Sequence, residues 1–150
     1  MVSPSSIGAY EGDLIRPLGL VTLFAAYAEG ELDELLAALA GNQPLDDEQQ
    51  QWPFGRKLKH AQGLALQLDT EVLAPLLETL TEARELFDRR NALVHGRLYS
   101  GGRLVSNRRD VPEKRVSPEE LGELSDLIFS CKERMWLHRQ KLVIPLLAKK

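Results

Sequence analysis

The feature that most constrains this chain is a run of apolar side chains between residues 17 and 40, spaced three or four positions apart. This spacing places them on one face of an α-helix, because one turn takes about 3.6 residues. A helix of that length extends over about 36 Å and must bury its apolar face against another part of the fold. The members of this face are Val21, Phe24, Ala25, Ala28, Leu32, Leu35, Leu36 and Leu39.

The same spacing recurs in three later segments, which we predict to be helices over residues 55–69, 70–95 and 117–143. Together with the first helix they predict one all-α domain, an up-and-down bundle of four to five helices. The long connection 97–116 contains a Gly-Gly pair and is expected to be a basic loop or a small hairpin. Residues 1–13 are expected to be a flexible N-terminus.

Several helix ends carry residues that are typical of caps and stops. Thr70 is a candidate cap for its helix, and Gly96 is a candidate left-handed stop after it. Ser117 followed by Pro118 is typical of a helix start, and Pro145 is expected to disturb the end of the last helix.

Cysteine content and hydropathy limit the compartment. The single cysteine, Cys131, excludes an internal disulfide and fits a reducing environment. There is no apolar run long enough to span a membrane. The first residues have neither a basic start nor an apolar core, as a signal peptide would have. We therefore expect a cytoplasmic protein without a membrane partner.

Charge is divided unevenly along the chain. Residues 84–115 hold nine basic and four acidic side chains, whereas residues 1–83 hold four basic and thirteen acidic ones. A basic segment on an acidic body favours a restricted anionic target, since bulk polyanion binders are usually basic throughout. Uneven charge without any ligand is the alternative. The candidate RNA-binding residues in this segment are Arg97, Arg103, Arg108 and Arg109.

Polar residues interrupt the apolar face near the end of the 70–95 helix. Steps of three and four along this face lead to Arg90, while Asn91 and His95 lie one turn apart beside it. A buried arginine without partners is costly. Arg90 must therefore be open to water, be paired with an acid such as Asp88 or Glu29, or be covered by another subunit. A polar helix end without chemistry is the simpler interpretation.

The stretch RRNALVHG, residues 89–96, resembles the signature of HEPN domains, the helical bundles of RNA-processing toxin, defence and RNA-maturation systems. Arg90 matches the signature arginine, Asn91 its polar neighbour and His95 the histidine, with four residues between arginine and histidine. An alternative match starts at Arg89 and leaves five residues between, but Arg90 is preferred because Asn91 then fills the polar position. The specific resemblance covers about residues 84–97. Outside this stretch only the helical architecture agrees.

The resemblance implies a metal-independent endoribonuclease of toxin or defence type that acts by attack of the RNA 2′-hydroxyl. Arg90, Asn91 and His95 would be its catalytic residues, in a site shared by the two subunits of a homodimer. RNA would be the substrate, and an antitoxin such as a nucleotidyltransferase-type protein would be a possible partner. The alternative is a non-catalytic helical module that binds a partner, a nucleotide or RNA.

Other polar residues are expected to be structural. His138 is expected to be a hydrogen-bonded core histidine, His60 a solvated one, and Cys131 a small buried side chain rather than a nucleophile. The scattered histidines and the single cysteine lack the spacing of metal ligands, so we expect neither a metal nor a cofactor. The acids Glu29, Glu31, Asp33 and Glu34 are expected to form the solvent face of the first helix.

Overall fold

The computed structural model describes residues 14–99, 102–106 and 109–149 of the chain. It confirms the predicted all-α bundle. The expected flexible N-terminus, residues 1–13, lies outside the described residues. Within the described ranges, no helix has both the length and the apolar character needed to cross a membrane.

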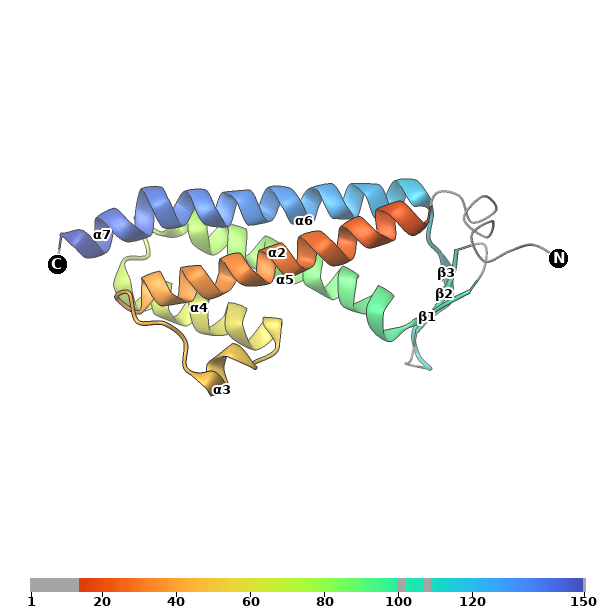
Figure 1. Cartoon of the computed structure of the whole chain (residues 1–150), viewed down its shortest axis with the longest axis horizontal. Helices are drawn as coiled ribbons and strands as arrows, with labels where there is room; N and C mark the ends of the chain where they lie inside the picture. Colours follow the sequence, from red (N-terminus) through yellow and green to blue (C-terminus); the bar gives the residue numbers. More distant parts are fainter. Residues whose placement is uncertain (1–13, 100–101, 107–108, 150) are drawn as a thin grey trace.

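Within the described residues, four long helices form the bundle and three short helical pieces accompany them (Figure 1). The long helices are α2 (Ile15–Leu39), α4 (Phe54–Leu68), α5 (Ala74–His95) and α6 (Pro118–His138). The short pieces are α3 (Asp47–Gln50), a π-helical turn η1 (Arg139–Val143) and α7 (Ile144–Ala148). The predicted helix ranges are therefore correct to within a few residues.

The most extensive contact of the bundle joins α2 and α6, which run in the same direction. The ring centroids of Phe24 and Phe129 lie 5.0 Å apart, and further along both helices Glu31 binds Arg139. This parallel pairing arises because the chain turns back between α2 and α4, through α3 (Figure 1). From α4 to α6 the helices alternate in direction, as predicted.

The core consists mainly of leucine and alanine from all four long helices. Every predicted face residue of α2 is buried except Phe24, which is half-buried and packs against the same core. Burial of each large aliphatic side chain contributes about 1.5–3 kcal/mol. The periodicity therefore located the interior of the bundle correctly.

Two acids of α2, Glu31 and Asp33, form ion pairs with basic residues of other segments. Glu31, only 9% exposed, accepts a hydrogen bond of 2.8 Å from Arg139 Nε. The buried Lys57 Nζ lies 2.8 Å from Asp33 Oδ1, in an ion pair without hydrogen-bond geometry, and donates to the Gln50 carbonyl. The predicted solvent face is thus wrong for Glu31, which Arg139 covers, whereas Asp33 pairs with Lys57 but keeps a side chain that is 37% exposed.

The start of α5 differs from the prediction. Thr70 is exposed and is not the cap. Asp69 Oδ1 instead accepts hydrogen bonds of 3.0 Å from the backbone N–H groups of Glu71 and Val72. These bonds hold a turn, and the helix itself begins at Ala74. The carboxylate of Asp69, one residue before Thr70, therefore organises this connection.

The two helix ends that flank the long connection are set by small residues. Gly96 adopts an extended conformation with φ −87°, not the predicted left-handed one. Glycine is needed for space, because a Cβ there would lie 2.6 Å from the Ala92 carbonyl oxygen and 3.0 Å from that of Val105. Ser117 caps α6 as predicted, since its hydroxyl accepts from the Glu120 N–H.

The connection 97–116 contains a small antiparallel sheet, in the order β1 (Arg97–Tyr99), β2 (Arg103–Val105) and β3 (Lys114–Arg115). This result agrees with the hairpin alternative. Leu98 pairs with Leu104 across the first two strands. Leu104, Val116 and Leu121 then form a second, smaller core that fixes the sheet to the start of α6.

The last helical segment changes pitch before Pro145. Proline has no N–H and its ring clashes with the carbonyl four residues earlier, here that of Lys141. The chain meets this constraint by passing through the π-turn η1 and continuing as α7. The predicted disturbance is therefore a local widening of the helix rather than its end.

Candidate functional site

The predicted catalytic residues lie in the last two turns of α5, where the helix leads into β1 (Figure 1). The side chain of Arg90 is 24% exposed, and its Nη1 donates a hydrogen bond of 2.7 Å to Asn91 Oδ1. The amide therefore fixes one end of the guanidinium. The structure brings these two predicted residues into direct contact.

A carboxylate and an aromatic ring occupy further sides of Arg90. Its Nη2 lies 3.5 Å from Glu29 Oε1, and its Cζ lies 5.7 Å from the centre of the Phe87 ring. Phe87 in turn stacks on Phe54, with ring centroids 3.4 Å apart. Of the arrangements expected for Arg90, two occur together: it pairs with Glu29 and it remains partly open to water.

His95 is the last residue of α5 and is exposed. Within the described part of the chain, no hydrogen bond or ion pair joins it to Arg90 or Asn91. Its ring nitrogens are therefore available to a ligand. Because His95 and Asn91 are four residues apart, they lie one turn apart on the same side of the helix.

The described candidate RNA-binding arginines lie on strands β1 and β2 (Arg97 and Arg103) and in the connection between β2 and β3 (Arg109). Arg97 and Arg109 are exposed, whereas Arg103 Nε lies 3.2 Å from Glu113 Oε1. Arg108 lies outside the described residues. The sheet thus offers positive charge beside His95, with one member of the group already partly neutralised.

Arg89 and Arg90 point to different surroundings. Arg89 lines a small hollow of about 30 Å³ between α5, the sheet and α6, together with Lys114 and Glu120. Arg90 instead faces Glu29 of α2. A hollow of this size has room for little more than a water molecule, so it is not a nucleotide site.

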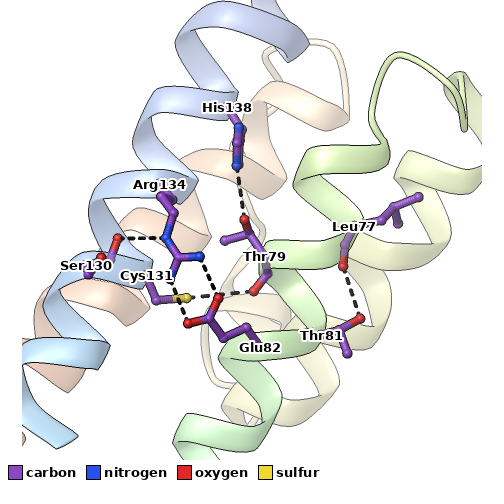
Figure 2. Close-up of polar contacts among 8 residues, drawn as sticks. All are labelled: Leu77, Thr79, Thr81, Glu82, Ser130, Cys131, Arg134 and His138. Carbon is purple, nitrogen blue, oxygen red and sulfur yellow. Dashed lines mark hydrogen bonds and ion pairs between the residues drawn. The ribbon is translucent and has the colours of Figure 1, made fainter. Parts of the chain in front are cut away.

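A second polar cluster joins α5 to α6 near the opposite end of α5 (Figure 2). Arg134 donates from both terminal nitrogens to the carboxylate of Glu82, at 2.6 and 2.7 Å. The hydrogen bonds from Arg134 lower the pKa of Glu82, although burial opposes this shift. The pair is a bidentate bridge between two packed helices.

The same cluster contains the cysteine and one histidine. Cys131 Sγ lies 3.7 Å from the Thr79 carbonyl oxygen, and burial raises the pKa of the thiol to about 12. His138 Nε2 lies 3.0 Å from Thr79 Oγ1, and burial also lowers the pKa of this imidazole (Figure 2). The predicted burial of Cys131 and the predicted hydrogen bonding of His138 are confirmed, although His138 is half-buried rather than fully in the core.

The third histidine differs from its prediction. His60 is half-buried, and its ring meets that of Trp52 edge-on at 5.4 Å. It is therefore packed rather than fully solvated. Sequence reasoning missed this contact because Trp52 precedes α4, and nothing in the helical periodicity places it against His60.

Among the residues that the structure describes, no group of three or more histidine, cysteine or acidic side chains is arranged to hold a metal ion. Comparison of the chain with protein-family models, with curated proteins and with solved structures finds no match in any of the three. The arrangement at the end of α5 must therefore be judged by its own chemistry: an exposed imidazole beside a positioned guanidinium and amide.

Proposed function

We propose that this chain is a cytoplasmic endoribonuclease that uses His95, Arg90 and Asn91, in a site shared by two copies of the chain. One observation carries the proposal. The imidazole of His95 is exposed and unpaired among the described residues, one turn from the bonded pair of Arg90 and Asn91. A basic sheet adjoins it, which suits a polyanionic substrate.

These groups supply what RNA cleavage by internal attack requires. The 2′-oxygen forms a bond to phosphorus while the bond from phosphorus to the 5′-oxygen breaks, which leaves a 2′,3′-cyclic phosphate. A base takes the 2′-hydroxyl proton, and an acid gives a proton to the departing 5′-oxygen. Imidazole performs either step near neutral pH, and a guanidinium stabilises the added charge on the phosphorane oxygens.

The contacts of Arg90 indicate how phosphate would bind. Asn91 holds Nη1, so the planar fork is already oriented. Glu29 lies at 3.5 Å from Nη2 and is 41% exposed, which makes it a weak, solvent-screened partner. A phosphate oxygen can replace it with a shorter charge-assisted bond.

One copy of the chain brings only one histidine to this site. Cleavage with simultaneous proton removal and donation uses two proton-transferring groups, and a two-fold dimer supplies a second imidazole and a second guanidinium. The proposal therefore includes a homodimer in which the ends of the two α5 helices face each other.

The experiment is incubation of the purified protein with RNA in EDTA, followed by analysis of the fragment ends. Cyclic-phosphate or 3′-phosphate ends that disappear in His95→Ala and Arg90→Ala support the proposal. Arg89→Ala is the matched comparison, because it removes an adjacent arginine that faces a different hollow. Failure of the wild-type protein to cleave RNA, or full activity in His95→Ala, would rule the proposal out.

A second candidate function is supported by the pairing of Arg90 with Glu29. An arginine held by a carboxylate of its own chain is typical of a structural helix end, as in a non-catalytic module that binds a partner or RNA. Glu29→Gln separates the two functions. In the ribonuclease it leaves Arg90 freer and maintains or raises cleavage, whereas in the module it only loosens the α2–α5 contact. The antitoxin-type partner implied by the resemblance is compatible with both functions.

A further inference from the structure

A second hollow, larger than the one beside Arg89, lies along the outer face of α4. It measures about 430 Å³, within the range of about 300–1,000 Å³ typical of small-ligand sites. Its lining comes from α4 and from Trp52, which lies just before this helix. The lining residues that matter here are Trp52, Arg56, Lys59, His60, Gly63 and Leu64.

The charge of this hollow is one-sided. Arg56 and Lys59 are exposed and His60 is half-buried, and no carboxylate contributes to the described lining. The segment that contains it is otherwise acidic, since residues 1–83 hold thirteen acids and four bases. Three of those four bases are Arg56, Lys57 and Lys59, and Lys57 is already paired inside the fold. The remaining two are therefore concentrated at this hollow.

An aromatic side chain stands beside these cations. The guanidinium carbon of Arg56 lies 4.1 Å from the centre of the Trp52 ring, and His60 contacts the same ring edge-on. The indole Nε1 of Trp52 is buried and has no hydrogen-bond acceptor among the described residues. An acceptor brought by a ligand that reached it would satisfy a donor that the protein leaves unpaired.

Gly63 keeps the middle of the hollow open. A Cβ added to it would meet no atom within 4 Å, so its lack of a side chain is not required by helix packing. Glycine inside a helix costs about 1 kcal/mol relative to alanine. Here its effect is to leave open space in the lining that it shares with Trp52 and Leu64.

We propose that this hollow binds one nucleotide unit, with the phosphate at Arg56, Lys59 and His60 and the base against Trp52 and Leu64. Cations for phosphate and an aromatic face for the base are the two elements that nucleotide-binding surfaces combine. The unit comes either from a free nucleotide or from an RNA strand. The proposal does not rest on RNA cleavage, because the hollow involves none of the residues Arg90, Asn91 or His95.

The experiment uses the fluorescence of Trp52 in the full-length protein. The chain has two tryptophans, so Trp136→Phe leaves Trp52 as the only one. His95→Ala in the same protein prevents the proposed cleavage. AMP, oligoadenylate and adenosine are then titrated separately in EDTA. We expect AMP or oligoadenylate to change the emission of Trp52, and adenosine, which lacks phosphate, to bind at least about tenfold more weakly.

Two variants test the location of the site. Arg56→Gln with Lys59→Gln removes the phosphate contacts and weakens binding about tenfold to a hundredfold. Its control is Lys141→Gln with Lys149→Gln, which removes the same charge from exposed positions in η1 and after α7. Gly63→Leu places an apolar side chain in the hollow, with a Cβ that meets no atom within 4 Å, and Gly19→Leu on α2, whose Cβ is equally free, is its control.

The outcomes separate the sources and decide the proposal. If AMP and oligoadenylate both bind, and Gly63→Leu abolishes the binding of both, the hollow is a general nucleotide site. If only oligoadenylate binds, and Gly63→Leu abolishes that binding, the nucleotide unit comes from an RNA strand. The proposal is overturned if neither ligand changes Trp52 emission, or if Gly63→Leu binds as well as Gly19→Leu. Absence of ribonuclease activity leaves these results unaffected.

Discussion

The two ends of α5 carry polar clusters of similar composition but different design. Near its start, Glu82 and the α6 residue Arg134 satisfy each other through two short hydrogen bonds. Near its end, Arg90 has one short bond to Asn91 and a looser contact with Glu29 at 3.5 Å.

The difference shows what makes a charged cluster available for chemistry. At the first end both terminal nitrogens of Arg134 face the Glu82 carboxylate on the neighbouring helix, so the cluster holds α5 to α6. At the second end His95 has no described partner and Arg90 keeps capacity for another acceptor. Residue type alone does not distinguish the two clusters; the number of unfilled hydrogen-bonding positions does.

The two histidines of these clusters provide the largest predicted effect. His95→Ala is expected to lower RNA cleavage by about 10²- to 10⁴-fold, the usual contribution of a proton-transferring group, with an unchanged melting temperature. His138→Gln keeps the hydrogen bond to Thr79 and is expected to leave cleavage unchanged. Rates and melting curves of both variants provide the check, and equal loss of cleavage in the two would contradict the comparison.

The joint between α5 and the sheet should be the most sensitive in stability. Gly96→Ala forces a Cβ to within 2.6 Å of the Ala92 carbonyl oxygen, and we expect a loss of about 1–3 kcal/mol in the free energy of unfolding. Gly19→Ala, in open space on α2, should instead gain up to about 1 kcal/mol. Urea denaturation of both variants measures the difference. A neutral Gly96→Ala would mean that the chain around Ala92 yields easily.

The two ion pairs should differ in coupling energy. A double-mutant cycle with Glu82→Gln and Arg134→Met is expected to give about 1 kcal/mol, because the pair is bidentate but about one-third exposed. The same cycle with Glu29→Gln and Arg90→Met should give no more than about 0.5 kcal/mol. Unfolding free energies at low salt provide the values. A larger coupling for the second pair would favour the structural interpretation of Arg90.

The smallest effect is a pH dependence of stability at the closed cluster. Burial lowers the pKa of His138 below its ordinary 6.5, so the unfolded chain takes up this proton first as the pH falls. Stability should therefore decline below about pH 6.5, and the wild-type protein should lose more than His138→Gln. The depressed pKa of Glu82 acts in a separate window, since its contribution is lost as the pH falls below 4.5. Thermal melts between pH 7 and 4 distinguish the two.

Periodicity alone was sufficient for the helices and for the core, since apolar side chains recur every three or four residues along α2 and along most of α5. It was not sufficient for Glu31 and Asp33. Their partners, Arg139 and Lys57, lie on other segments, and acids that face a neighbouring helix look the same in sequence as acids that face water. The sequence indicated that a glycine is needed at position 96. It did not indicate the cause, which is the close approach of the Ala92 carbonyl oxygen and of β2.

For the candidate site, helix geometry placed Arg90, Asn91 and His95 together at the end of a helix, but it did not predict the hydrogen bond between Arg90 and Asn91. The choice between water and Glu29 as the neighbour of Arg90 stayed open, because it depends on how far along α2 the end of α5 crosses it. The hollow beside Trp52 had no periodic signal at all. It depends on how the segment before α4 folds back onto that helix.

The π-turn before Pro145 also sets the direction, around the helix axis, in which the side chains after it point. A π-turn accommodates one residue more than a regular turn, so the residues beyond it are rotated by about 100° relative to an uninterrupted α-helix. With that rotation, Leu146 and Leu147 pack against the main core. Removing one residue between 139 and 143 would therefore give a regular helix with these leucines still facing the core, whereas winding all five residues as regular α-helix would turn the leucines by about 100°. The π-turn thus absorbs one residue and keeps the last turn of the chain in register with the bundle.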